Sequence, residues 1–311
     1  DELIGPRALL YSPPQKKELE KEIYQRISLI APDDLEYQMD EMRIFKQVNV
    51  LRVAAADVTG VLPLMKVSDR LTEIAETILE EVLEFSWKHL VTKHGRPSCM
   101  INKGVCEKGF VVVAYGKLGG IELGYESDLD LVFLHAGEEG KTNGKQPIDN
   151  KTFFVRLCQR VIHFLSAHTM AGILYKTDMR LRPSGTSGFL VSHINAFYDY
   201  QKKDAWTWEH QALVRARPIA GEPKLAEKFE RIRSNILIQE RTKNELAKDV
   251  ITIRQRLREE QLYKKKGILD LKQGYGGILD IEFLVQYLTL LYASKHIELV
   301  NWTDNIRLIE T

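Results

Sequence analysis

The chain has 311 residues, of which 44% are hydrophobic and 28% are charged, the proportions of an ordinary globular protein. These proportions exclude a disordered chain, a collagen-like repeat and a small scaffold held together by disulfides. The formal net charge is +1, from 44 Lys and Arg against 43 Asp and Glu. A protein that holds nucleic acid through phosphate contacts usually carries a basic excess, so we expect no nucleic-acid partner.

The length of the chain points to more than one domain, because a single hydrophobic core stops growing at roughly 250–300 residues. The predicted elements divide the chain into a helical segment over residues 1–97, a catalytic core over residues 98–220 and a helical carboxy-terminal domain over residues 221–311. The chain begins without Met and stops inside a helical pattern, which predicts a piece of a longer protein.

Cysteines and apolar segments indicate the compartment. Cys99, Cys106 and Cys158 are odd in number and form no CxxC pair, which fits a reducing compartment. No apolar run approaches the ~18–20 residues that a membrane span needs. The chain also lacks a signal-peptide pattern. The prediction is a cytoplasmic enzyme without membrane contact.

The first third of the chain has helical periodicity after an irregular lead-in over residues 1–14. Apolar residues three and four positions apart predict one helix with a single buried face, formed by Leu35, Met39, Met42, Phe45, Val48 and Leu51. A second helix is expected to begin with Ser68 as its N-cap and to end at Gly95. Its predicted buried face consists of Leu71, Ile74, Ile78, Val82 and Phe85.

The pattern then changes to short runs typical of buried strands. These are FVVVAY (110–115), LDLVFL (129–134), ILYKTD (173–178) and GFLVS (188–192). Helices are expected over residues 150–169, with Asp149 as cap, and again over 224–238, 245–262 and 279–294. The predicted fold class is therefore α+β, with a small mixed sheet flanked by helical bundle segments.

Two aspartates mark the predicted strand 129–134. Asp128 and Asp130 project from one face, because side chains alternate along a strand, while Leu129, Leu131 and Phe133 point into a core. Two carboxylates ~4 Å apart repel each other by roughly 4 kcal/mol at an effective dielectric of ~20. A cation must compensate, and Mg²⁺ prefers such hard oxygen ligands. The simpler alternative is that one aspartate caps the strand and the other is solvated.

A glycine-rich turn precedes the aspartates. Its residues Gly116, Lys117, Gly119 and Gly120 follow a strand, and backbone N–H groups at such a turn can approach a phosphate. Ala114 stands where a dinucleotide fingerprint needs its first glycine. The acidic pair also comes sooner than the single acid expected ~20 positions on in such a fold. A nicotinamide-binding domain is therefore the weakest alternative.

A third carboxylate, Asp178, ends the predicted strand 173–178 and is followed by Arg180 and Arg182. Together with the aspartate pair it would form a three-carboxylate, two-metal site for phosphoryl or nucleotidyl transfer. Asp178 would bind metal or take the proton from an incoming hydroxyl. The arginines would neutralise phosphate, and salt bridges to local acids are the alternative for both.

This order of a glycine turn, Asp-x-Asp and a later aspartate resembles the nucleotidyltransferase superfamily that includes DNA polymerase beta. A closer resemblance is to the bifunctional glutamine synthetase adenylyltransferases, which carry one adenylylating and one adenylyl-removing half. It rests on VVVAYGKLGGIELGYESDLDLVFL, GILYKTDMRLRPSGTSGFLVS, DAWTWEHQALVRARPIAG and GGILDIEFLVQYL. The phrases IELGYESDLDL and AWTWEHQALVRAR resemble the carboxy-terminal, adenylylating half.

The resemblance implies roles for particular residues. Asp128, Asp130 and Asp178 would be the catalytic residues and would bind Mg²⁺, as two ions. The ATP-binding residues would be Gly116, Lys117, Gly119, Gly120, Ser127, Arg180 and Arg182.

The implied reaction transfers AMP from ATP to a tyrosine hydroxyl of glutamine synthetase, releasing pyrophosphate and regulating nitrogen assimilation. Glutamine synthetase would be the protein substrate, and the full-length enzyme would respond to the nitrogen-signalling PII protein and to glutamine. Two alternatives stay open. One is phosphorolytic removal of the adenylyl group, and the other is a catalytically silent nucleotide-sensing module.

Charged residues elsewhere have two interpretations each. In the aromatic helix that contains Glu209, the spacing places Arg215 on one face with Trp208, directed at a cleft or packed on the core. Asp280 and Glu282 would add carboxylates around the site, or simply favour a helix N-terminus. The run Lys264–Lys266 is expected to be a solvated loop.

Overall fold

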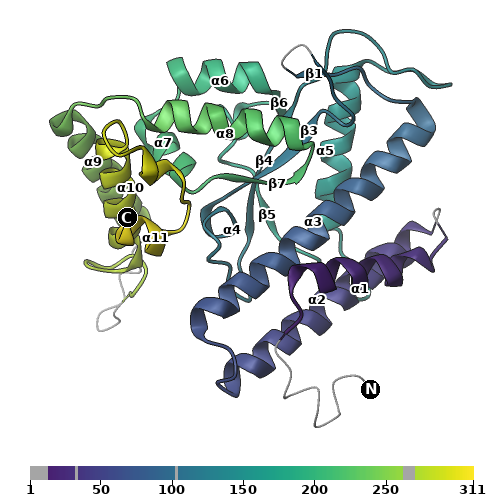
Figure 1. The fold of residues 1–311 in the computed structure, drawn as a ribbon, viewed down its shortest axis with the longest axis horizontal. Coiled ribbons are helices and arrows are strands. Elements are labelled where there is room, and N and C mark those ends of the chain that lie inside the picture. The colour runs from purple at the N-terminus through teal and green to yellow at the C-terminus, as the bar shows by residue number, and fades with distance from the viewer. Residues whose placement is uncertain (1–12, 32–33, 102–103, 262–269) are drawn as a thin grey trace.

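The computed structural model describes residues 13–31, 34–101, 104–261 and 270–311. Nearly all of the expected lead-in over residues 1–14 and the basic run Lys264–Lys266 lie outside these residues. A small mixed sheet stands at the centre, with helices on both faces (Figure 1). The predicted α+β class is confirmed.

Three helices form the first layer, α1 (Lys16–Ser28), α2 (Leu35–Val58) and α3 (Leu64–His94). Helix α3 begins after Pro63, so the prediction of Ser68 as the N-cap is wrong. Leu51 in α2 is exposed rather than buried. The buried stripe continues through Val53 and Ala56, because a period of 3.6 residues moves the buried face one position along.

The central sheet is built around two long strands, β3 (Phe110–Tyr115) and β4 (Leu129–His135), which pair antiparallel. Strand β7 (Arg217–Gly221) pairs antiparallel with the other edge of β3. Strands β5 (Thr177–Asp178) and β6 (Val191–His193) both run parallel to β4. The predicted strands 110–115 and 129–134 are therefore confirmed.

Two strand predictions need correction, and one further strand was not predicted. The strand expected over 173–178 is reduced to Thr177–Asp178, because Tyr175 donates its backbone N–H to Leu165 at the end of the preceding helix. The strand expected over 188–192 is displaced to Val191–His193. Strand β7, with the sequence RPIAG, was not expected, since Pro and Gly are poor strand formers.

The two faces of the sheet pack against different helices. One face, which includes Leu129, Leu131 and Phe133, shares a hydrophobic core with α1–α3 and with α5 (Asn150–Ser166). The opposite face packs against α6 (Ile194–Lys203), α7 (Thr207–Val214) and α8 (Pro223–Leu237). The prediction that the apolar residues of β4 point into a core is confirmed, and Asp130 lies on the opposite face.

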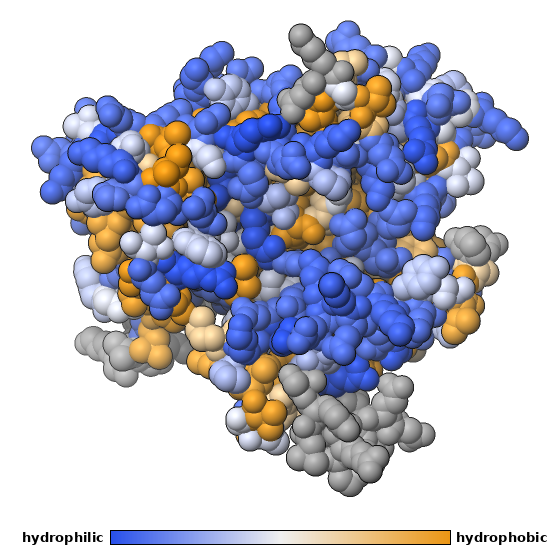
Figure 2. Space-filling model, viewed as in Figure 1, coloured by the Kyte–Doolittle hydropathy of each residue, from blue (hydrophilic) through white to orange (hydrophobic). Residues whose placement is uncertain are grey.

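The carboxy-terminal helices are α9 (Lys243–Gln261), α10 (Ile278–Tyr292) and α11 (Asn305–Glu310), with the short helix η2 (Ile297–Val300) between the last two. Helices α9 and α10 pack against α7. Apolar side chains gather on the surface of the carboxy-terminal helices (Figure 2). The exposed ones on α10 are Ile278, Ile281, Leu284, Leu288 and Tyr292. Within the described ranges, none of the helices combines the length and apolar character required to cross a membrane.

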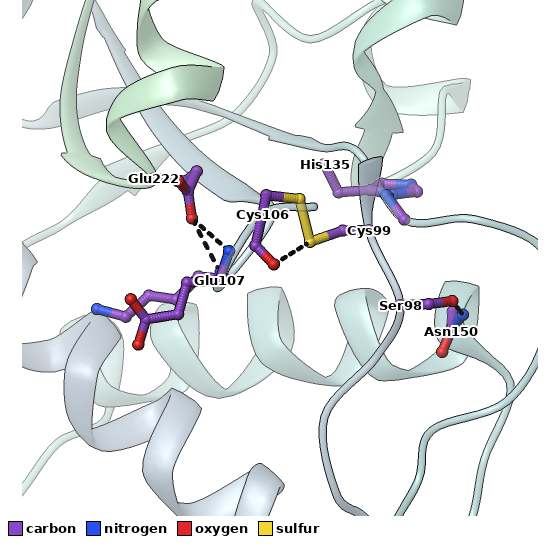
Figure 3. Close-up of a disulfide and its surroundings, with 9 residues drawn as sticks. Ser98, Cys99, Cys106, Glu107, His135, Asn150 and Glu222 are labelled. Atoms are coloured by element: carbon purple, nitrogen blue, oxygen red, sulfur yellow. Dashed lines mark hydrogen bonds between the residues drawn. A yellow bond between two sulfur atoms is a disulfide. The ribbon is translucent and has the colours of Figure 1, made fainter. Parts of the chain in front are cut away.

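A disulfide joins Cys99 to Cys106 (Figure 3). The short strands β1 (Met100–Ile101) and β2 (Gly104–Val105) pair antiparallel between these cysteines, so the two Cα atoms come within 5.6 Å. The sequence prediction paired no cysteines, because the three are odd in number and form no CxxC pair. Cys158 is a buried free thiol.

Candidate active site at the start of strand β4

The predicted carboxylates meet where β4 begins. Asp130 pairs in register with Asp178 on the parallel strand β5, and Asp128 immediately precedes β4. Paired residues on neighbouring strands project from the same face. Burial, together with the charges of Asp178 and Asp128, raises the pKa of Asp130 to about 6. The three carboxylates therefore interact electrostatically.

Gly116 lies directly against Asp130. It has a φ of +55° and opens the four-residue helix α4 (Gly116–Gly119). A Cβ atom at Gly116 would overlap the carboxylate oxygen Oδ2 of Asp130. The left-handed backbone and the close approach both require glycine at this position.

Asp178 is held by Arg180. The Arg180 Nε donates to both carboxylate oxygens at 3.0 and 2.8 Å, Nη2 donates to Oδ2 at 2.5 Å, and the Arg180 backbone N–H donates to Oδ1 at 2.9 Å. These hydrogen bonds lower the pKa of Asp178. The Arg180 side chain is 78% exposed, so the arginine can leave the carboxylate without disturbing the core.

The acidic side chains fit a divalent cation by their chemistry. Carboxylate oxygens are the ligands that Mg²⁺ prefers, and burial followed by the negative charges of Asp178 and Asp128 raises the pKa of Asp130. In the ranges that the structure describes, no three or more His, Cys, Asp or Glu side chains are gathered as closely as metal ligands. The contact between Asp178 and Arg180 is consistent with this, because the guanidinium takes the place of a cation at that carboxylate.

The other glycines of the turn have a packing role. Gly119 and Gly120 are buried, and a Cβ atom on either would overlap Arg215. The carbonyl of Gly119 accepts a hydrogen bond from Arg217 at 3.1 Å. Lys117, in contrast, is exposed at the surface of the turn.

The remaining predicted ATP-binding residues organise loops. The Ser127 hydroxyl accepts a hydrogen bond from the backbone N–H of Gly124 at 3.0 Å. Arg182 donates to the backbone carbonyls of Met179, Thr186 and Gly188, which fixes the segment after β5. Its partners are therefore carbonyl oxygens rather than local acids.

Arg215 connects the glycine turn to the carboxy-terminal helices. Its buried guanidinium forms ion pairs of 2.6 Å with Glu122, just after the turn, and with Glu282 on α10. Glu122 also accepts a hydrogen bond from the backbone N–H of Asn305 at the start of α11. Sequence analysis missed Glu122, because its partners are far away in the chain.

Asp280 and Glu209 have structural partners. Asp280 accepts hydrogen bonds from Arg254 and Arg258, which join α9 to α10. Glu209 accepts hydrogen bonds from the Tyr200 hydroxyl and from the backbone N–H of Trp206 at the start of α7.

A cavity of about 420 Å³ lies beside Gly116, although none of the three aspartates lines it. Gly116, which touches Asp130, and Leu181, three positions after Asp178, line one side of it. The other lining residues come from helices α7, α9 and α10 and are Trp208, Gln211, Ala212, Arg215, Ile253, Arg256, Leu257, Glu282, Phe283 and Gln286. Sequence analysis left Arg215 either directed at a cleft or packed on the core, and it did not identify Gln211 or Gln286.

Comparison with known proteins shows the family of the chain. A family model described as glutamate-ammonia ligase adenylyltransferase matches residues 1–232. Three curated proteins named bifunctional glutamine synthetase adenylyltransferase/adenylyl-removing enzyme align with the whole chain. They come from Thioalkalivibrio sulfidiphilus at 50% identity, Methylococcus capsulatus at 48% and Shewanella loihica at 49%.

The chain spans about a third of these relatives, covering 32%, 33% and 33% of their lengths. The family model, however, matches well over half of the chain and extends across the sheet, the glycine turn and all three aspartates. The chain therefore belongs to the glutamate-ammonia ligase adenylyltransferase family.

Proposed function

We propose that the chain transfers AMP from ATP to a tyrosine hydroxyl of glutamine synthetase and releases pyrophosphate. The observation that carries this proposal is the register of Asp130 with Asp178 beside Gly116. Nucleotidyl transfer needs negative side chains that hold cations against a triphosphate, and little covalent chemistry from the protein. The family membership and the printed names of the relatives support the same reaction.

Asp128, Asp130 and Asp178 are the residues that would hold Mg²⁺, as two ions. When bound, the metal would neutralise the charge of the triphosphate and polarise its phosphorus–oxygen bonds. With a pKa of about 6, Asp130 is mostly ionised at neutral pH and is available as a ligand. Arg180 leaves Asp178 and neutralises a phosphate oxygen instead, as its exposed side chain allows.

Lys117 and Gly116 are the turn residues that we propose for direct phosphate contact, because Lys117 is exposed and Gly116 adjoins Asp130. Gly119 and Gly120 are buried against Arg215, so their part in ATP binding is to shape the turn. Ser127 and Arg182 likewise hold the loops that flank the carboxylates. Asp178 accepts the proton of the tyrosine hydroxyl once Arg180 has left it.

The adenylyl-removing reaction is the second candidate. The relatives are named for both activities, and the chain covers only a third of them. The same carboxylates would serve phosphorolysis of adenylyl-tyrosine, with inorganic phosphate as the attacking group. A silent sensor is less consistent with the site, because Asp130 retains two carboxylate neighbours that disfavour its ionised form.

We also propose the partners, the effectors and the compartment of the enzyme. Glutamine synthetase is the protein substrate, and the longer protein responds to the PII protein and to glutamine. The reaction takes place in the cytoplasm. These assignments rest on the sequence resemblance and on the family of the chain.

Incubation with Mg²⁺, α-labelled ATP and unmodified glutamine synthetase tests the proposal. Label on a tyrosine of the synthetase is the expected result. Release of ADP from pre-adenylylated synthetase, dependent on inorganic phosphate, would instead assign the chain to the removing reaction. If neither reaction occurs while ATP still binds, the chain is a nucleotide sensor and the proposal is wrong.

A further inference from the structure

We propose that Glu122 is a positioning residue for the glycine turn. It holds the left-handed backbone of Ile121 in place, and it makes the position of Lys117 depend on helix α11. The inference rests on the proposed function, which assigns Lys117 to phosphate contact. It adds the residue that shapes the turn and the distant element that holds this residue.

The glycine turn ends helix α4 in a Schellman motif. The backbone N–H of Glu122 donates to the carbonyl of Lys117 at 2.8 Å. The backbone N–H of Ile121 donates to the carbonyl of Leu118 at 3.3 Å. These two hydrogen bonds define the motif, and Gly120 is the C-cap. Ile121 therefore occupies the left-handed position after the C-cap, where glycine is the usual residue.

The backbone of Ile121 is strained in this position. Its φ is +55°, and in the described ranges Ser184, with a φ of +61°, is the only other non-glycine residue with a positive φ. A β-branched residue is a genuine outlier there, because the left-handed conformation brings Cβ close to the following carbonyl oxygen. Such a conformation persists only where surrounding contacts hold it.

Glu122 supplies contacts of this kind. Its Oε2 accepts a hydrogen bond from Arg215 Nη2 at 2.6 Å. Asn305, the first residue of α11, donates its backbone N–H to Oε1 at 3.0 Å and its Nδ2 to Oε2 at 3.3 Å. One carboxylate therefore ties the residue after Ile121 to a buried arginine and to a distant helix.

The residue before Ile121 is held by the same arginine. A Cβ atom on Gly120 would overlap the guanidinium of Arg215, so the turn and the arginine are in close contact there. Ile121 thus lies between two residues that both contact Arg215. Its side chain also borders α11, because Ile121 and Ile306 line one cavity of about 170 Å³.

The consequence for the nucleotide concerns Lys117. Its carbonyl accepts the hydrogen bond from the Glu122 backbone, and its side chain is exposed at the turn. When Glu122 is released, Ile121 is free to leave the left-handed region, and this hydrogen bond is lost. Phosphate affinity should then fall, although every group proposed to contact phosphate is still present.

Calorimetric binding of ATP and of inorganic tripolyphosphate, each with Mg²⁺, tests this inference. Glu122→Gln keeps the size of the side chain and removes its negative charge. Both ligands should bind about tenfold more weakly, because both use the turn and a charge-assisted hydrogen bond is lost. Unchanged affinities in the folded variant would overturn the inference.

Ile121→Gly distinguishes a positioning role from a merely structural one. Glycine adopts the left-handed conformation without strain, so the turn no longer needs Glu122 to hold it. In this background Glu122→Gln should weaken both ligands by less than about twofold. An equal loss in both backgrounds would show that Glu122 does not act through Ile121.

Ser184→Gly is the matched control for the relief of strain. Ser184 has nearly the same φ as Ile121, but it lies in the segment after β5 and outside the glycine turn. Combined with Glu122→Gln, this substitution should leave the loss of affinity at its full size. Restored affinity in this control would contradict the inference.

Asn305→Pro is the second variant if Glu122→Gln fails to fold. Proline is favoured at the first position of a helix, and the extended backbone of Asp304 suits a following proline. The substitution removes both donors from Asn305 to Glu122. Both ligands should bind about threefold more weakly, and Ile121→Gly should cancel this loss. Wild-type affinities in Asn305→Pro would contradict the role of α11.

The wild-type protein separates the two proposals. If it binds both ligands and Glu122→Gln binds them equally well, only the positioning role is removed. Failure of the wild type to bind either ligand with Mg²⁺ would overturn the proposed function together with this inference.

Discussion

At the scale of single residues, Gly116 is the position on which the geometry of the carboxylates depends. Its backbone has φ +55°, and its missing Cβ leaves room for the Asp130 carboxylate. Gly60 has a similar φ of +69°, but nothing lies within 4 Å of where its Cβ would be. Alanine substitutions at the two glycines therefore distinguish the effect of a left-handed backbone from the effect of crowding Asp130.

Gly116→Ala should reduce AMP transfer by about a hundredfold or more, because Asp130 must move away from its position. Gly60→Ala should lose only about 1 kcal/mol of folding free energy, the cost of a left-handed conformation, and keep full activity. Initial transfer rates and urea unfolding of both variants provide the comparison. Equal rates in the two variants would mean that the contact between Gly116 and Asp130 is unimportant for the reaction.

Asp130→Asn should abolish transfer and stabilise the fold in metal-free buffer. The native state raises the pKa of Asp130 from the usual 3.8 to about 6, so the ionised carboxylate is less stable in the folded than in the unfolded protein. This destabilisation is absent below about pH 4, grows through pH 6 and is complete at about pH 7–8. There the variant should gain up to about 3 kcal/mol of folding free energy.

Urea unfolding of the wild type and the Asn variant across this pH range measures the gain. The exposed Asp128 provides the control, because Asp128→Asn should change stability much less while still impairing transfer. Full transfer activity in Asp130→Asn would remove the proposed metal site.

Some of these residues could be predicted from the sequence, and others could not. Alternation along a strand places Asp130 opposite Leu129 and Leu131, and the structure agrees. The pairing of Asp130 with Asp178 spans 48 positions, and it is a matter of strand register rather than local pattern. Glu122 offered no signal, because its partner Arg215 lies 93 positions away.

At the scale of elements, Arg215 joins three parts of the chain that are distant in sequence. It follows α7, contacts Glu122 beside the glycine turn and contacts Glu282 on α10. Its side chain is 3% exposed, so the ion pairs are largely shielded from water. The glycine turn and the helices that line the cavity are therefore held in one arrangement.

Arg215→Ala should lower the free energy of unfolding by about 3 kcal/mol, because it leaves two partly buried carboxylates without their counter-ion. Lys66→Ala is a suitable control. Lys66 forms an exposed ion pair with Asp69 three positions away, and removal of such a pair costs less than about 1 kcal/mol. Urea unfolding at neutral pH measures both losses, and similar values would show that burial of the Arg215 network contributes nothing.

Long elements with strong periodicity were predictable, and short ones were not. Helices α8 and α10 lie within two residues of their expected ends, because each buries a regular stripe against the core. Strand β7 contains Pro218 and depends on its pairing with β3, so the local sequence gives no sign of it. Strand β5 has two residues, and its place depends on β4.

At the scale of the whole molecule, the sheet belongs to two hydrophobic cores at once. One core combines the sheet with α1–α3 and α5, and the other extends from the opposite face to Val285 and Leu308 in the carboxy-terminal helices. The division into segments 1–97, 98–220 and 221–311 stays a prediction, but each outer segment shares a core with the central one.

We expect these shared cores to give a single cooperative unfolding transition. Each of the three segments contains a tryptophan that can report on its unfolding. Trp87 lies in α3, Trp208 in α7 and Trp302 just before α11. Variants that retain one tryptophan each should show the same urea midpoint. Midpoints that differ between Trp87 and Trp302 would indicate that the helical segments unfold as separate domains.

The ion pair between Arg180 and Asp178 has a consequence for the order of assembly. The arginine is an internal counter-ion, so a cation that approaches Asp178 alone competes with a charge that is already in place. A triphosphate offers the guanidinium another anion and thereby frees the carboxylate. Each ligand then relieves the competition that opposes the other, and thermodynamic linkage makes their binding mutually reinforcing. The protein is therefore expected to bind metal and nucleotide together rather than to bind the metal before the nucleotide.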